Sequence, residues 1–132
     1  MTAQIIGCAI EVHRALGPGL LESAYEQCMA HELSLRGLRF GVQVPIPVLY
    51  KGLALACAYK ADLVIEGDVV VELKSVDSIT ALHQAQLLTY LKLTGARVGL
   101  LVNFNVRRLV DGLTRFRRLA GEAAPGSEAA GR

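Results

Sequence analysis

Two short apolar segments on either side of one turn constrain this chain more than any other feature of its sequence. Residues 61–65 (ADLVI) and 69–73 (VVVEL) flank Glu66-Gly67-Asp68, and their large apolar residues mostly carry odd numbers. Directly opposed residues of a hairpin share a face, so odd numbers oppose odd numbers only across a loop with an odd number of residues. A three-residue loop with Gly67 in a left-handed conformation meets this condition. The sequence therefore predicts a β-hairpin in this register.

The other face of the predicted hairpin is charged. Asp62 then opposes Glu72, and Lys60 opposes Lys74, while the residues around Glu72 are apolar. Two neighbouring carboxylates repel each other, and a divalent cation such as Mg²⁺ or Mn²⁺ removes that repulsion. A metal held in this way lowers the pKa of a bound water and draws charge from a phosphoryl oxygen, with Lys74 placed to assist. The alternative is a surface salt bridge in which Lys74 only neutralises Glu72.

Helical periodicity precedes these strands. Residues 2–16 carry apolar residues at three- and four-residue steps, which predicts an amphipathic helix. The repeating residues are Ile5, Ala9, Val12 and Leu16. Gly17-Pro18-Gly19 ends this helix, and a second helix is expected over 20–36, ended by Gly37.

Two helices place polar side chains on one face. On the second helix these are Glu22, Tyr25 and Glu26, with an expected core side of Leu21, Ala24, Cys28 and Leu35. A third helix is predicted over 79–94, ended by Gly95. Its polar stripe is His83, Gln86 and Tyr90, and its expected buried side is Leu82, Ala85, Leu88 and Leu91. Simpler roles remain open: a helix-dipole acid for Glu22, an exposed histidine for His83 and a core aromatic for Tyr90.

The remaining strands follow from alternation and turn residues. An edge strand is predicted over 42–50, because Pro45 and Pro47 remove donors from one side. Lys51-Gly52 forms a two-residue hairpin loop, and the next strand carries one apolar face. That face consists of Leu53, Leu55, Cys57 and Tyr59.

The segment 98–104 (VGLLVNF) is almost wholly apolar, so it predicts a strand covered on both faces by helices. For residues 106–119 we favour a turn and a last edge strand over 113–118, with a short helix as the alternative.

Composition limits the classes of protein that remain. The 132 residues suit one domain, expected over 1–120, with a small polar tail over 121–132. The sequence shows neither an apolar run long enough to span a membrane nor a signal-peptide pattern. Cys8, Cys28 and Cys57 have no zinc or disulfide spacing, which favours a reducing cytoplasm. No phosphate-binding loop of the P-loop type is present.

The net charge of +2 does not by itself indicate a nucleic-acid partner, but the distribution of charge does. Residues 97–118 contain six arginines and a single acid, Asp111. The arginines expected to contact phosphates are Arg107, Arg108, Arg115, Arg117 and Arg118. A solvated basic edge strand that resists aggregation explains the same residues.

At this point the motifs resemble a known family. Residues 19–25 (GLLESAY) match the signature G-x-x-E-x-x-Y, and four further segments follow in order: YKAD at 59–62, VELK at 71–74, QLLTYL at 86–91 and LVNF at 101–104. This ordered set resembles the GxxExxY family of the PD-(D/E)XK nuclease superfamily, over about residues 5–118. Gln86 and Tyr90 resemble the Q-x-x-x-Y element of its RecB/Cas4-like branch.

The resemblance implies a three-layer α/β/α restriction-endonuclease-like core with a mixed sheet. It implies that Asp62, Glu72, the carbonyl of Leu73 and Glu22 bind the metal, that Lys74 is catalytic, and that Gln86 and Tyr90 complete the site. Ala61 stands where a proline often precedes the first acid.

We therefore expect a Mg²⁺- or Mn²⁺-dependent nuclease that hydrolyses phosphodiester bonds, with DNA as the first expectation and RNA processing as another. The alternative is a non-catalytic nucleic-acid-binding or assembly module that keeps the nuclease fold. A mean hydropathy of +0.38 is high for a small monomer, and a homo-oligomer is compatible with it. Metal-dependent stabilisation discriminates between these hypotheses, because a module that has lost catalysis gains little from the cation.

Overall fold

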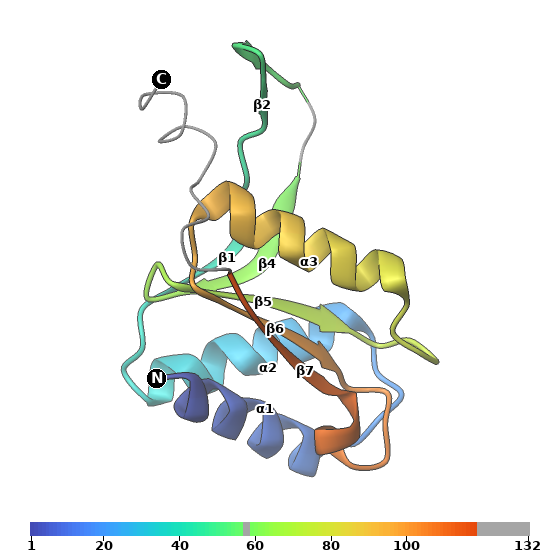
Figure 1. Cartoon of the computed structure of the whole chain (residues 1–132). Helices are drawn as coiled ribbons and strands as arrows, with labels where there is room; N and C mark the ends of the chain where they lie inside the picture. The colour runs from blue at the N-terminus through green and yellow to red at the C-terminus, as the bar shows by residue number, and fades with distance from the viewer. Residues whose placement is uncertain (57–58, 119–132) are drawn as a thin grey trace.

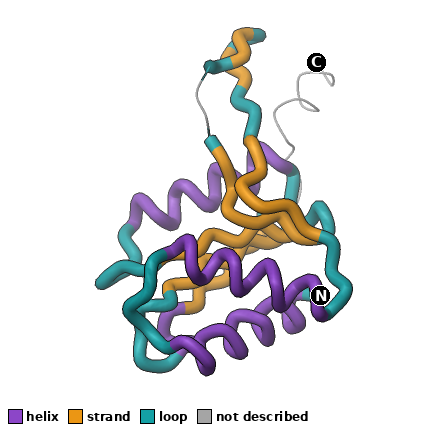
Figure 2. Tube along the Cα trace, turned by 180° about the vertical axis from the view of Figure 1, so that it is seen from behind, coloured by secondary structure: helices purple, strands orange, loops and turns teal. Residues whose placement is uncertain are grey.

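The computed structural model describes residues 1–56 and 59–118. A mixed sheet lies between two helical layers, with α1 and α2 on one face and α3 on the other (Figure 1), and the same layers are visible from behind in Figure 2. The predicted three-layer α/β/α architecture is confirmed. The helices are α1 (Thr2–Leu16), α2 (Glu22–Leu35), α3 (Ala81–Thr94) and the short 3-10 helix η1 (Leu109–Gly112).

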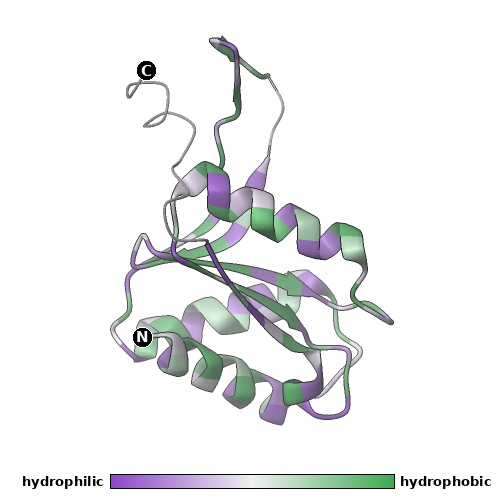
Figure 3. Ribbon diagram, viewed as in Figure 1, coloured by the Kyte–Doolittle hydropathy of each residue, from purple (hydrophilic) through white to green (hydrophobic). Residues whose placement is uncertain are grey.

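The sheet has the strand order β1-β4-β5-β6-β7. Its strands are β1 (Phe40–Pro45), β4 (Lys60–Ile65), β5 (Val69–Lys74), β6 (Val98–Asn103) and β7 (Leu113–Arg117). Only β5 and β6 run parallel, and the other neighbours are antiparallel. The central strands are mostly apolar (Figure 3), because helices cover both of their faces.

The β4–β5 hairpin has the predicted register. Leu63 pairs with Val71 and Ile65 with Val69, and the three residues between the strands include Gly67 at a φ of 65°. The odd-numbered strand residues from 63 to 73 enter the core beneath α1 and α2, while Ala61 and Val70 pack on the α3 side. Parity alone was sufficient here because one slipped residue would have moved every apolar side chain to the wrong face.

The faces of two helices differ from the prediction. On α2 the buried residues are Tyr25, Met29 and Leu33, whereas Leu21 and Leu35 are exposed. Tyr25 belongs to the core and not to a polar face: its ring stacks on Phe104 with centroids 4.3 Å apart. Its hydroxyl donates to the carbonyl of Gly17 at 2.6 Å. The aromatic ring offered more apolar area than the smaller residues of the expected stripe.

On α3 the buried residues are Leu87, Tyr90 and Leu91, and the expected core residues Leu82 and Leu88 are exposed. The helix begins with a capping box, in which the Thr80 side chain and His83 accept each other's backbone N–H. It ends at Gly95 in the left-handed conformation, as predicted. The apolar residues of this helix are spread around its circumference, so its sequence alone did not show which face is buried.

β1 lies at the sheet edge, as its prolines predicted. The expected long strand is interrupted after β1, however. Its second half is β2 (Leu49–Tyr50), which pairs with β3 (Leu53–Ala54) across the predicted Lys51-Gly52 loop to form a separate arm. This arm projects away from the sheet (Figure 1). The expected position of Cys57 and the predicted tail over 121–132 lie outside the described residues.

β7 follows the short helix η1, so residues 106–119 contain both of the elements considered for them. Within the described part of the chain, no helix has the length and apolar character needed to cross a membrane.

Candidate active site

Two carboxylates replace backbone pairing where β4 and β5 separate. Beyond the Leu63–Val71 pair, the backbone N–H of Asp62 donates to Glu72 Oε2 at 2.7 Å. In return, the N–H of Leu73 donates to Asp62 Oδ2 at 2.8 Å. Each acid is thus held by the partner strand, at the end of β5 that leads towards α3. The two side chains predicted to form the centre of the site lie together.

Glu72 is buried, with only 4% of its surface exposed. Burial, and after it the nearby charge of Asp62, raise the pKa of Glu72 to about 7 against the opposing effects of the hydrogen bond from the Asp62 N–H and of Lys74. A buried carboxylate with a second carboxylate beside it is an environment that favours a proton or a cation. The chemistry of this pair therefore fits a divalent metal ion with oxygen ligands.

Lys74 follows Glu72 on β5 and is half-buried. It forms none of the four ion pairs found among residues 1–56 and 59–118, so the alternative of a Lys74–Glu72 salt bridge is not what the structure has. Its backbone is fixed by β6: Lys74 pairs with Asn103, and its carbonyl accepts from the N–H of Phe104 at 2.9 Å. A rigid backbone thus presents an ammonium group that forms no ion pair with a described carboxylate, although its charge acts on Glu72.

Glu22 approaches the same end of the sheet from the first residue of α2. Its Oε2 accepts from the N–H of Ser75 at 3.1 Å, directly after Lys74, and the hydroxyl of Ser75 donates to the carbonyl of Leu20 at 2.6 Å. Its charge contributes to the raised pKa of Glu72. Within the described part of the chain, however, no three His, Cys, Asp or Glu side chains form a group able to hold a metal ion. Glu22 lies at the rim of the pair.

Two residues of this region were not among the predicted site residues. The side-chain amide of Gln43, on β1, donates to Asp62 Oδ1 at 3.0 Å and to Glu26 Oε2 at 2.6 Å. The sequence placed Glu26 on the face of Glu22 but gave it no role, and it indicated nothing about Gln43. No local signal could show that Gln43 contacts Asp62, because that contact depends on the pairing of β1 with β4.

α3 contributes Tyr90 beside the carboxylates. Tyr90 is 4% exposed, and burial raises the pKa of its hydroxyl, with further contributions from Glu72 and Asp62. Gln86 is exposed one turn earlier. The structure thus brings Tyr90 near the acid pair, whereas His83 serves the helix cap described above.

An apolar groove of about 490 Å³ runs between α3 and the base of the arm. Its polar and aromatic lining consists of Tyr59, His83, Gln86, Thr89 and Tyr90. Tyr90 also lies within the electrostatic influence of Glu72 and Asp62, so it links one wall of the groove to the carboxylate pair.

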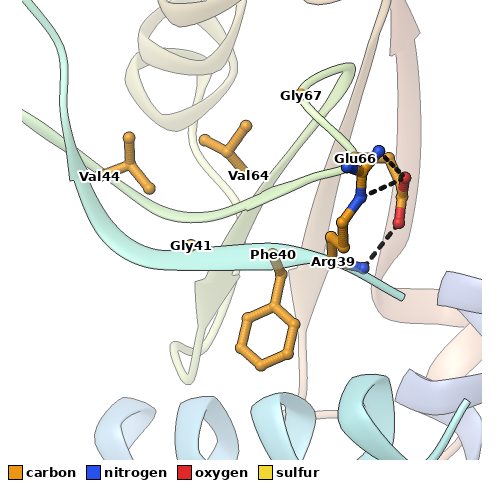
Figure 4. Close-up of a pocket in the computed structure, with 7 residues that line it drawn as sticks. All are labelled: Arg39, Phe40, Gly41, Val44, Val64, Glu66 and Gly67. Atoms are coloured by element: carbon orange, nitrogen blue, oxygen red, sulfur yellow. Dashed lines mark hydrogen bonds and ion pairs between the residues drawn. The ribbon is translucent and has the colours of Figure 1, made fainter. Parts of the chain in front are cut away.

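A second hollow of about 500 Å³ lies at the turn end of the β4–β5 hairpin (Figure 4). Its charged residues satisfy each other, since the Arg39 guanidinium lies 3.2 Å from Glu66 Oε1 and the backbone N–H of Arg39 donates to Glu66 Oε2. These bonds lower the pKa of Glu66. This hollow therefore offers a structural clamp and no free chemical group.

The predicted phosphate-binding arginines do not form one patch. Arg107 and Arg108 follow β6 at the end where Lys74 pairs with Asn103, and both are exposed. Arg115 and Arg117 lie on β7 and run back towards the opposite end of the sheet. Arg118 follows them there and donates to the carbonyl of Ala96. Only the first pair lies beyond the end of β6 that is level with Lys74.

The sequence-family model of the PD-(D/E)XK nuclease superfamily matches residues 1–116 of the chain. The chain belongs to this superfamily. No curated protein and no solved structure matches the chain significantly. As a member of the PD-(D/E)XK superfamily, the protein is nuclease-like, and its mixed sheet is the architecture that the superfamily implies.

Proposed function

We propose that this protein is a Mg²⁺- or Mn²⁺-dependent nuclease of the GxxExxY type, in the RecB/Cas4-like branch of the superfamily, that hydrolyses phosphodiester bonds of DNA. The observation that carries the proposal is the reciprocal arrangement of Asp62 and Glu72, in which each acid accepts a backbone N–H of the opposite strand. If either carboxylate moved away, a backbone N–H group of the opposite strand would lose its hydrogen bond, so both carboxylates are held at one place.

Asp62 and Glu72 are the residues that would hold the metal, with the Leu73 carbonyl and Glu22 as further candidates. When bound, the cation lowers the pKa of a water and withdraws charge from a phosphoryl oxygen. The chain's own contribution is orientation: the β4–β5 hairpin fixes the two carboxylates, and β6 fixes the backbone of Lys74. The ammonium of Lys74 then donates hydrogen bonds to the attacking water or to a phosphate oxygen.

The groove beside α3 supports a nucleic-acid substrate. Its lining combines an exposed aromatic ring, Tyr59, with the amide of Gln86 and the hydroxyl of Thr89. Aromatic rings stack on bases, and amides and hydroxyls bind base edges, so an unpaired nucleotide beside the cleaved bond is suited to this lining. Arg107 and Arg108 lie at the same end of the sheet as Lys74 and would contact the phosphates.

Cleavage of short labelled substrates tests this function. We expect wild-type protein to cut linear, nicked or single-stranded DNA with Mg²⁺ or Mn²⁺, and Lys74→Ala to be folded and inactive. Lys92→Ala, an exposed lysine near the end of α3, is the matched control and should cut as wild type does. If the wild type cleaves no DNA or RNA with either metal, the enzymatic proposal is wrong.

The exposed arm favours a second candidate, a non-catalytic assembly module. Leu49, Tyr50 and Leu53 are 54–60% exposed, which is unusual for apolar residues of a two-stranded hairpin. In that case the protein would associate through the arm, as a homo-oligomer or with another chain. Thermal unfolding with and without Mn²⁺ discriminates, because an intact metal site should raise the melting temperature by several degrees when the metal is well above its Kd.

Two cysteines of the described residues, Cys8 and Cys28, are unpaired. This supports the proposal that the protein works in the reducing cytoplasm.

A further inference from the structure

Gln43 has a backbone conformation that needs an explanation. Three described non-glycine residues have positive φ angles, and two of them, Lys51 and Glu66, lie in hairpin turns where such angles are normal. Gln43, at a φ of 51°, lies inside β1. Side chains disfavour this region, and residues forced into it gather at functional sites.

The pairing of β1 with β4 shows what this conformation achieves. Val42 pairs with Leu63 and Val44 with Ala61, so Gln43 lies opposite Asp62 at the point where the strand turns out of its regular form. There its amide nitrogen lies between two carboxylates, 3.0 Å from Asp62 Oδ1 and 2.6 Å from Glu26 Oε2. Both partners only accept hydrogen bonds, so the amide uses both of its N–H groups.

We infer that Gln43 is a positioning residue for Asp62, an inference that rests on the proposed nuclease function. Asp62 Oδ2 is held by the N–H of Leu73, and Gln43 holds the other oxygen, so the carboxylate cannot rotate. Glu26 in turn orients the amide so that its N–H₂ group, and not its carbonyl oxygen, faces Asp62.

The choice of an amide is chemically specific. A lysine or arginine at position 43 would hold Asp62 more strongly but would neutralise it, and the acid would then attract a divalent cation less. A neutral donor fixes the orientation and leaves the negative charge available. Such outer partners of metal-binding carboxylates typically change metal affinity or activity by about 10- to 100-fold when they are removed.

Substitution by glycine separates the contribution of the Gln43 side chain from that of its backbone conformation. Gly adopts positive φ without strain, so Gln43→Gly keeps the shape of β1 and removes only the amide. We expect this variant to melt at or above the wild-type temperature and yet to need about 10-fold more Mn²⁺ for half-maximal cleavage or stabilisation. Lys51→Gly is the matched control, because it relieves the same backbone angle in the exposed arm and should leave the metal response unchanged.

A second readout requires neither metal nor activity. In the metal-free protein, hydrogen exchange of the Leu73 amide should be faster in Gln43→Gly, because Asp62 no longer remains in place to accept it. The Val71 amide, in the paired part of β5, is the internal reference. Gln43→Leu should show the same acceleration in a strained background.

The outcomes are distinguishable. If Gln43→Gly retains wild-type protection at Leu73 and wild-type Mn²⁺ dependence, the positioning role is wrong although the nuclease proposal stands. If the wild type neither cleaves nor responds to Mn²⁺, the proposed function fails. The Leu73 comparison then still decides whether Gln43 holds Asp62.

Discussion

Glu72 provides the most direct test of the electrostatics of the site. The substitution Glu72→Gln keeps the size of the side chain and an oxygen that can accept the N–H of Asp62, but it removes the buried charge. In the metal-free protein the charged form of Glu72 is disfavoured by burial and by Asp62. We therefore expect the variant to be more stable than the wild type in alkaline solution, although it loses the proposed activity.

The sign and size of the expected stability change follow from the pKa of Glu72. Folding raises the pKa of Glu72 from 4.5 to about 7, so the folded state binds the proton more tightly than the unfolded state does. Between these two values the free energy of unfolding of the wild type falls as pH rises, and above pH 7 the loss is complete. A shift of this size corresponds to a loss of about 3 kcal/mol. The variant does not titrate at this position and escapes that loss.

Urea unfolding of both proteins at pH 4 and pH 8, without divalent metal, measures the effect. The difference in unfolding free energy between Glu72→Gln and wild type should grow by about 3 kcal/mol in favour of the variant, and titrating groups that do not interact with Glu72 cancel in the comparison. Glu66→Gln is a control of opposite sign. Hydrogen bonds to Arg39 lower the pKa of Glu66, so this variant should lose more stability relative to wild type at pH 8 than at pH 4.

A difference that does not change with pH would refute the reasoning, because it would mean that Glu72 is solvated where the strands separate. A variant less stable than wild type at pH 8 would refute it also. Mn²⁺ at pH 8 provides a further check, since it should stabilise the wild type and leave Glu72→Gln nearly unaffected.

Three further predictions concern the surroundings of the site. Tyr25→Phe removes two hydrogen bonds to the loop before α2 and should lower the unfolding free energy by about 1–2 kcal/mol in urea titrations. Gly112→Ala places a methyl group against the backbone carbonyl oxygen of Asn103 and should cost about 3 kcal/mol or prevent folding, as circular dichroism will show. Arg107→Ala should weaken DNA binding and its salt dependence, measured by fluorescence anisotropy, whereas Arg115→Ala should have a smaller effect.

The parts of the fold that could be predicted are those in which a local sequence pattern was compatible with a single structure. The parity of residues 61–73, together with an odd loop, fixed both the hairpin register and the proximity of Asp62 and Glu72. Gly95 ended α3 as expected, and the apolar segment at 98–104 became the covered strand β6.

The faces of α2 and α3 could not be predicted because the apolar residues of each helix do not form one stripe, whereas Ile5, Ala9 and Val12 of α1 are buried as predicted. On α3, Leu82, Leu87, Leu88 and Leu91 point in several directions, and only contact with the sheet decides which are buried. Gln43 shows a different limit. Its role depends on a backbone angle and on a strand that pairs with it 19 residues later, and neither leaves a pattern in the sequence.

The arm formed by β2 and β3 has a consequence for how such a protein can change over time. Neither of its strands contributes a buried residue to the core on either side of the sheet. Residues there are released from the packing demands that restrain the rest of the chain. Length, charge and shape at this projection can therefore diverge while the carboxylate pair stays intact, which makes the arm the natural place for related nuclease-like proteins to acquire different binding partners.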